Sequence, residues 1–216
     1  MPDKTKPPIF NSSPFKKIKV PDSLYNLIQD EYKKMTFSQV INDVVYEQEY
    51  KAHTCGGISV KGTTNPYHFK DNISKELYDE CYKIITPIVE EWCGVKLEHS
   101  WAYGVRSYTK NSILHLHRDR VDTHIISCII YVDQNSEINW PLDFYDHDNK
   151  HHQVKFDYGD MLLYESLCVH GRETPFQGQY YRNMYFHWKP VDWDPSPYTN
   201  MKTSFRNGNQ LLNYYV

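Results

Sequence analysis

The sequence has no long apolar run, no excess of basic residues and no paired cysteine motif. No apolar run approaches the roughly 18 residues that a membrane-spanning helix needs, and no apolar stretch follows Met1 that could direct secretion. A formal net charge of −3 and a pI near 6.4 provide little attraction to a nucleic-acid backbone or an anionic membrane. We therefore expect a cytoplasmic protein with neither a nucleic-acid nor a membrane partner.

The five cysteines are odd in number, irregularly spaced and without a CxxC pair. This pattern argues against a disulfide framework or a zinc ribbon and favours reduced, mostly buried thiols. A chain of 216 residues fits one domain and is long enough to bury a core without disulfides.

Composition and periodicity divide the chain into four parts. These are a proline-rich lead at 1–20 that is extended or disordered, a helical part at 21–96 that packs on a barrel, a β core at 97–190, and a C-terminal extension at 191–216. Asp22 can cap the first helix. A second helix is predicted from Ser74 as N-cap to a stop at Gly94, and Pro87 inside it predicts a kink or a break.

From residue 97 the apolar period changes from 3.6 to 2, which is typical of β-strands. Eight strands are predicted, near residues 100–108, 112–117, 124–132, 141–145, 151–156, 160–164, 167–170 and 180–188. About eight antiparallel strands preceded by helices indicate an α+β, mainly β fold. The expected architecture is a jelly roll, a cupin-like barrel, with supporting helices on one outer face.

Three potential metal ligands follow one another with the spacing of a strand. His115, His117 and Asp119 share a face because side chains alternate along a strand. Two histidines and one carboxylate can hold an octahedral iron(II) by one triangular face and leave three positions open. His170, at the end of an apolar strand, is the best candidate for the third ligand. His115 and His124 are then expected beside the ligands but outside the ligand set.

Two other readings of these histidines remain open. A metallo-hydrolase could use His115, His117 and Asp119, although Arg120 stands where a two-metal hydrolase needs another histidine. A non-catalytic cupin-like metal-binding module could pair His115 with His117, although a suitably spaced glutamate is missing.

Residues 97–190 resemble the prolyl 4-hydroxylase-like branch of the iron(II)/2-oxoglutarate-dependent dioxygenases. The resemblance depends on ordered motifs: Tyr108, His117-Arg-Asp119, Ser127-Cys-Ile-Ile-Tyr131, Phe156-Asp-Tyr-Gly159-Asp160, His170, and Arg182 through Trp188. It implies a double-stranded β-helix, a bound Fe(2+), 2-oxoglutarate and O2 as cosubstrates, and ascorbate as a supporting reductant.

The resemblance also implies roles for individual residues. His117, Asp119 and His170 match the iron ligands. A basic residue on the strand after the distal histidine usually binds the 2-oxoglutarate C5 carboxylate, and Arg182 matches it; a planar guanidinium can pair bidentately with a carboxylate. The sequence departs from the family pattern here, because Tyr180 occupies the spacing at which a lysine or arginine is expected.

Further residues are assigned to the cosubstrate or substrate pocket. Arg106 and Arg172 are alternative ligands of the cosubstrate carboxylate, and Trp188 is a candidate for the substrate pocket. Tyr108 and Tyr131 match positions that border the cosubstrate.

The activity implied by the resemblance is hydroxylation of a peptidyl residue, prolyl as the first guess, with succinate and CO2 as co-products. A hydroxylase of a free amino acid or another small metabolite is the alternative, since one scaffold serves many substrates. The expected partner is accordingly a peptide, a protein or a small metabolite.

Overall fold

The computed structural model describes residues 6–35, 67–70, 73–110 and 112–201. Its elements, in chain order, are β1 (Phe15–Lys19), α1 (Asp22–Lys34), β2 (Tyr67–Lys70), α2 (Lys75–Cys93), β3 (Leu97–Thr109), β4 (Leu114–His117), β5 (Ile126–Asn135), β6 (Leu142–Tyr145), β7 (His151–Val154), β8 (Asp160–Glu165), β9 (His170–Arg172), β10 (Tyr180–Pro190) and a 3-10 turn at Ser196–Tyr198. None of the described helices is long and apolar enough to cross a membrane.

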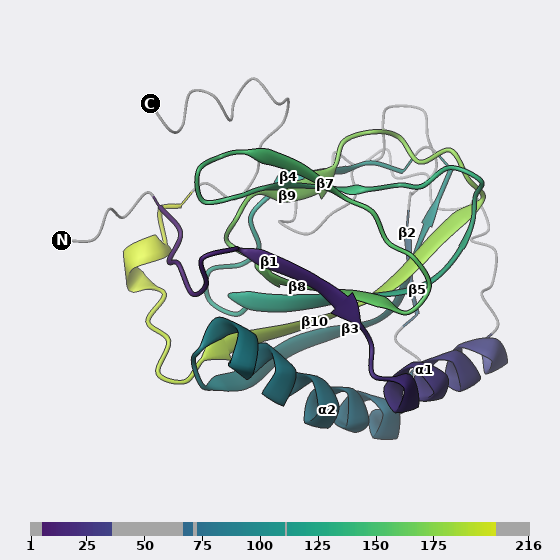
Figure 1. Ribbon diagram of the computed structural model, residues 1–216, viewed down its shortest axis with the longest axis horizontal. Coiled ribbons are helices and arrows are strands. Elements are labelled where there is room, and N and C mark those ends of the chain that lie inside the picture. Colours follow the sequence, from purple (N-terminus) through teal and green to yellow (C-terminus); the bar gives the residue numbers. More distant parts are fainter. Residues whose placement is uncertain (1–5, 36–66, 71–72, 111, 202–216) are drawn as a thin grey trace, which may run out of the picture.

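The strands form two antiparallel sheets. The larger has the order β1-β8-β5-β10-β3-β2 and the smaller the order β4-β9-β6-β7. Figure 1 shows the smaller sheet on one side of the larger sheet, with α1 and α2 on the other side. This is the predicted jelly roll with helices on one outer face.

Two apolar cores follow from the alternation of side chains in the larger sheet. One core lies between this sheet and the helices and includes Leu24, Ile85 and Phe186. The other lies between the two sheets and is rich in aromatic residues, among them Phe144 and Tyr181. The two faces of the larger sheet therefore differ in composition. The aromatic-rich face lines the interior of the barrel, and the other face packs against the helices.

Helix α2 has the ends that its sequence predicts. The Ser74 Oγ accepts a hydrogen bond from the Leu77 N–H, and Gly94 ends the helix with φ +74°, a conformation that glycine adopts without strain. The helix runs from 75 to 93 in one piece, so the break expected at Pro87 does not occur. The residues that it buries are Leu77, Cys81, Ile85, Val89, Trp92 and Cys93.

The larger sheet contains two strands that were not expected. β1 lies in the lead at 1–20 and pairs with β8, so the described part of the lead is extended and includes a strand. β2 pairs with β3. All eight predicted strands are found, although the seventh begins only at His170, because residues 166–168 form a turn. The Cys168 N–H donates to the Glu165 carbonyl within that turn.

Candidate active site

Strand pairing brings the three predicted metal ligands together. β4 and β9 are antiparallel neighbours, and His117 lies directly opposite His170. Asp119 follows β4 by two residues, and its N–H donates to the Ser166 carbonyl at 3.0 Å, which fixes this loop against the turn before β9. All three side chains are buried at the inner face of the smaller sheet.

The ligand atoms converge on one point. One ligand atom from each of His117, Asp119 and His170 lies within 4.8 Å of the other two. The Asp119 Oδ1 is 3.5 Å from the His117 Nε2, and the Asp119 Oδ2 is 3.8 Å from the His170 Nε2. Two imidazoles and one carboxylate on a common face are the donor set that suits iron(II) with open positions. The residues present therefore fit the implied metal.

Hydrogen bonding and burial leave the His170 Nε2 available as a ligand. The His170 Nδ1 lies 2.9 Å from the Cys168 carbonyl. A carbonyl only accepts, so Nδ1 carries the proton and Nε2 keeps its lone pair. Burial, with His117 adding to it, lowers the pKa of His170 to about 4. Burial alone would raise the pKa of Asp119, but the surrounding histidines outweigh it and hold that pKa well below its usual range. Neutral imidazoles and an ionised carboxylate are the forms that bind metal.

Two further side chains contact Asp119. The Tyr164 hydroxyl donates to its Oδ2 at 3.4 Å, and the His187 Nδ1 lies 3.9 Å from the same oxygen. His187 in turn packs against His124, with ring centroids 3.8 Å apart. Burial, then His124, lowers the pKa of His187. Tyr164 thus orients the carboxylate from the side of the larger sheet, whereas the hydrogen-bond partner of the His187 Nδ1 is the Ser127 Oγ, 2.5 Å away.

Arg172 lies in the barrel, on the same face of β9 as His170. Its guanidinium carbon is 4.7 Å from the Trp140 ring centroid and 4.5 Å from that of Tyr181. It donates to the Trp140 carbonyl and, at 3.0 Å, to the Tyr181 hydroxyl. The side chain is fully buried. Among the described residues no carboxylate pairs with it, and none accepts a hydrogen bond from its Nε. A guanidinium without a counter-charge is costly to bury unless a ligand supplies one.

Asn183 is the second unsatisfied group in the barrel. It is fully buried on β10, and within the described parts of the chain neither atom of its amide has a hydrogen-bond partner. Its strand neighbours across the sheet are Arg106 on β3 and Tyr131 on β5. A buried amide that lacks all of its hydrogen bonds is expected where a polar ligand binds.

Arg106 is surrounded by tyrosines. Its guanidinium carbon lies 5.3 to 5.6 Å from the ring centroids of Tyr103, Tyr108 and Tyr185. It donates to the Tyr108 hydroxyl at 3.0 Å, and the Tyr108 and Tyr185 hydroxyls are 2.9 Å apart. A second positive charge is therefore buried in the barrel, in a cluster of hydroxyl groups.

Comparisons with known proteins agree on the fold. No protein-family model and no curated protein sequence matches the chain. Among solved structures, a Pseudomonas putida prolyl-4-hydroxylase is similar with a TM-score of 0.56 and 15% identity, over 83% of this chain and 94% of that one. EctD from S. alaskensis, solved with 2-oxoglutarate and 5-hydroxyectoine, is similar with a TM-score of 0.56 and 10% identity, over 85% and 74%. AviO1 from Streptomyces viridochromogenes Tue57 reaches 0.58 at 10% identity, over 86% and 94%. The chain has the fold of iron(II)/2-oxoglutarate oxygenases.

Within this oxygenase fold, two of the predicted pocket residues, Arg182 and Trp188, lie on the face of β10 that points toward the helices. Arg182 donates to the hydroxyl of Tyr32 on α1 and to the Ser107 Oγ, and its guanidinium stacks on the Tyr180 ring. Trp188 packs in the helix-facing core, and its Nε1 donates to the Thr86 Oγ1 of α2. Alternation along β10 is the reason, because even-numbered positions here face the helices. In this arrangement neither side chain lines the barrel interior.

Three of the remaining predicted residues, Tyr108, Tyr131 and His124, are buried within the described structure. Tyr108 and Tyr131 both belong to the core between the sheets, and Tyr131 contacts the Tyr181 ring. His124 reaches Asp119 only through His187. The His115 side chain lies outside the described part of the structure, so its expected place beside the ligands stays a prediction.

Four side chains at this site were not predicted from the sequence. They are Tyr164, Asn183, Tyr185 and His187. Three of them lie on one face of β10, and the signal that could have found them is the alternation of that strand. Tyr181, Asn183, Tyr185 and His187 are polar or aromatic, whereas Met184, Phe186 and Trp188 between them are apolar and belong to the helix-facing core.

Proposed function

We propose that this protein is a non-haem iron(II)- and 2-oxoglutarate-dependent dioxygenase that hydroxylates its substrate. The observation that carries the proposal is the convergence of His117, Asp119 and His170 on one buried point of a jelly roll. Iron(II), 2-oxoglutarate and dioxygen supply the oxidation of an unactivated C–H bond, with succinate and CO2 as co-products. The chain has to hold the metal, bind the cosubstrate, orient the substrate and exclude water.

The residues around the ligands support the proposed binding of the metal. The Cys168 carbonyl fixes the ring of His170, and the Tyr164 hydroxyl donates a hydrogen bond to the Asp119 carboxylate. Groups that orient metal ligands in this way contribute strongly to metal affinity. Burial of the three ligands keeps competing water away from the face that they occupy.

For the cosubstrate, we assign the C5 carboxylate to Arg172 instead of Arg182. Arg172 lies two residues after the distal histidine, points into the barrel and has no counter-charge among the described residues. Tyr181 occupies the inward position on β10, and its hydroxyl accepts a hydrogen bond from Arg172. The Arg172 guanidinium thus lies against the inward-facing Tyr181 of the next strand, β10. The unsatisfied Asn183 amide on β10 can contribute further hydrogen bonds.

Anaerobic addition of iron(II) and 2-oxoglutarate to the purified protein tests the proposal directly. We expect a weak metal-to-ligand charge-transfer band in the visible range, because 2-oxoglutarate chelates an iron(II) that the triad leaves half open. The band should require both additions and disappear when iron(II) is replaced by zinc(II). Absence of the band in protein with a folded circular dichroism spectrum would contradict the proposal.

The leading substrate is a peptidyl residue, with prolyl first, and one of the similar structures is a prolyl-4-hydroxylase. A specific observation also supports a free amino acid or another small anionic metabolite. Arg106 places a buried positive charge inside the barrel, in a cluster of tyrosine hydroxyls that suits a carboxylate. EctD, which was solved with the small molecule 5-hydroxyectoine, has the same fold.

Succinate release over a panel of proline-containing peptides and free amino acids separates these two substrate classes. A peptidyl hydroxylase should release succinate with blocked peptides that have no free carboxylate. A metabolite hydroxylase should respond only to the free acids and should lose that response in Arg106→Met. Release with neither class would reject both substrates while leaving the charge-transfer test of the cosubstrate chemistry intact.

A further inference from the structure

A second group of metal-binding side chains lies outside the triad. His147 comes from the loop between β6 and β7, Glu165 ends β8, and Cys168 lies in the turn before β9. One potential ligand atom from each lies within 4.8 Å of the others. The His147 Nε2 is 3.5 Å from the Glu165 Oε2 and 3.3 Å from the Asn11 carbonyl oxygen, and the His147 Nδ1 is 3.7 Å from the Cys168 Sγ. Because a carbonyl only accepts, Nε2 carries the proton, and Nδ1, beside the Cys168 sulfur, is the ring nitrogen that keeps its lone pair for an ion. The group shares no residue with the triad.

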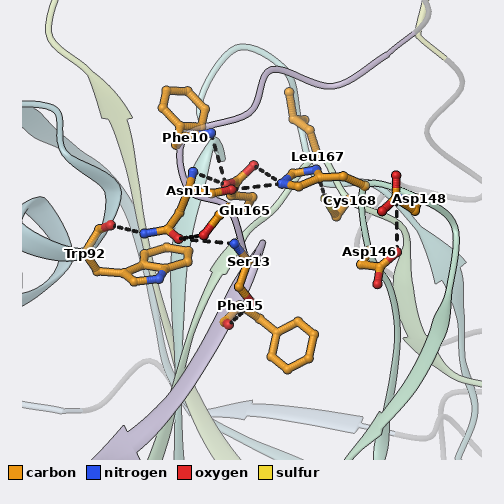
Figure 2. A network of polar contacts seen from close by, with 12 residues as sticks. Phe10, Asn11, Ser13, Phe15, Trp92, Asp146, Asp148, Glu165, Leu167 and Cys168 are labelled. Carbon is orange, nitrogen blue, oxygen red and sulfur yellow. Dashed lines mark hydrogen bonds and ion pairs between the residues drawn. The ribbon is translucent and has the colours of Figure 1, made fainter.

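Within the described part of the chain, only one oxygen of the Glu165 carboxylate accepts hydrogen bonds. Oε1 accepts hydrogen bonds from the Phe10 N–H at 3.1 Å and the Asn11 N–H at 2.8 Å, as Figure 2 shows. Oε2 accepts none in the described part of the chain and faces His147. The residue is 1% exposed, and burial raises the pKa of its carboxyl to about 7. A buried acceptor left open in this way points to a ligand.

A pocket of about 200 Å³ lies beside two of the three residues. His147 and Cys168 both line it. Its other charged residues are the acids Asp146 and Asp148 and the bases Lys6 and Arg118, so their formal charges cancel. A volume of this size accommodates a hydrated cation together with further water.

We propose that His147, Glu165 and Cys168 bind a divalent cation of the zinc class. One thiolate, one imidazole and one carboxylate are donors that zinc takes in proteins, and a thiolate favours zinc over the hard cations. Three protein ligands leave a fourth, tetrahedral position for water from the pocket. The bound cation displaces the thiol proton of Cys168, since a coordinating thiol is deprotonated.

The position of the group indicates what the cation does. The group connects three segments of the chain. These are the N-terminal segment at Phe10 and Asn11, the β6–β7 loop, and the turn that precedes β9. The backbone carbonyl of Cys168 in that turn holds the ring of His170. The cation therefore stabilises the turn that positions the distal ligand of the triad.

Cobalt(II) titration of the full chain tests this site separately from the triad. Only a site with a cysteine produces a thiolate-to-cobalt charge-transfer band in the near ultraviolet, and the triad has none. We expect the band in the wild type and also in Asp119→Ala, where the triad is impaired. Cys168→Ser should abolish it, and His147→Gln and Glu165→Gln should each weaken cobalt binding at least tenfold. His151→Gln, which removes a half-exposed histidine from the same hairpin, should leave the band and its affinity unchanged.

Two results would overturn the site. One is the absence of a thiolate band in folded Asp119→Ala protein at saturating cobalt(II). The other is a band whose affinity is the same in His147→Gln and Glu165→Gln as in wild type, which would locate the thiolate elsewhere. These two variants retain Cys168 and so decide the question even if Cys168→Ser does not fold. Because the readout does not depend on 2-oxoglutarate, its failure would leave the dioxygenase proposal standing.

Discussion

Replacing Asp119 with alanine is expected to abolish the charge-transfer band of the iron(II)/2-oxoglutarate complex and to reduce succinate release by more than about 100-fold. Loss of groups that merely orient a metal ligand costs about 10- to 100-fold in affinity or activity, and Asp119 is itself a ligand in this proposal. It is also the only carboxylate of the triad, so the variant leaves only two neutral imidazoles to hold the metal. Visible absorption under anaerobic conditions and a succinate assay measure the two effects.

The matched control is Asp122→Ala, which removes an exposed acid three residues further along that forms an ion pair with Arg120 and accepts a hydrogen bond from the Thr123 hydroxyl. It should retain the band and the activity. His115→Ala should also retain the band if His115 lies outside the ligand set. Loss of bound metal in His115→Ala would instead favour a site that pairs His115 with His117, and a band that survives Asp119→Ala would exclude Asp119 as a ligand.

Replacing Arg172 with methionine is expected to raise the KM for 2-oxoglutarate by at least about 30-fold, which corresponds to about 2 kcal/mol of binding free energy. The guanidinium is fully buried among Trp140, Phe156 and Tyr181, so the incoming carboxylate would form its ion pair in a region of low dielectric. Methionine fills much of the same volume without the charge. Steady-state kinetics at varied 2-oxoglutarate, with the strength of the charge-transfer band as a direct measure of binding, test this.

Arg182→Gln is the matched control, because it removes an arginine that contacts Tyr32 and Ser107 on the helix-facing side of the larger sheet. Its KM for 2-oxoglutarate should change less than threefold, while its melting temperature can fall through the lost contact with α1. The opposite pattern, a high KM in Arg182→Gln and an unchanged KM in Arg172→Met, would show that the assignment by family resemblance is right. Both variants need the circular dichroism spectrum of the wild type for the comparison to hold.

Much of the fold follows from local patterns. The change of apolar period at residue 97 separates helices from strands, and the Ser74 and Gly94 ends of α2 are recognised from residue type alone. β1 was not foreseen, because its five residues carry three lysines among prolines and its strand character depends on pairing with β8. Of the kink or break predicted at Pro87, the break is absent, since packing of α2 against the sheet keeps the helix continuous.

The resemblance pointed to Arg182 even though Tyr180 occupies the family spacing, and it did not include the face of β10 on which the side chain lies. Alternation continues along β10 through the register shifts around Asn183, so Arg182 shares the helix-facing side with Met184 and Phe186. Arg182 thus points toward α1, while Arg172, on another strand, enters the barrel. No count of residues along the chain reveals which of two arginines is buried without a counter-charge.

For the triad, the sequence by itself determined the donor types and their order. His117 and Asp119 lie two apart, so strand geometry alone puts them on one side, and His170 ends an apolar strand further on. Only the tertiary structure decided that β4 and β9 are neighbours, that His187 and Tyr164 reach Asp119, and that Arg172 and Asn183 lie unsatisfied in the barrel. The physical reason is that alternation and propensity act between near neighbours in the chain. Convergence of ligands and missing hydrogen bonds are properties of pairs that are distant in sequence.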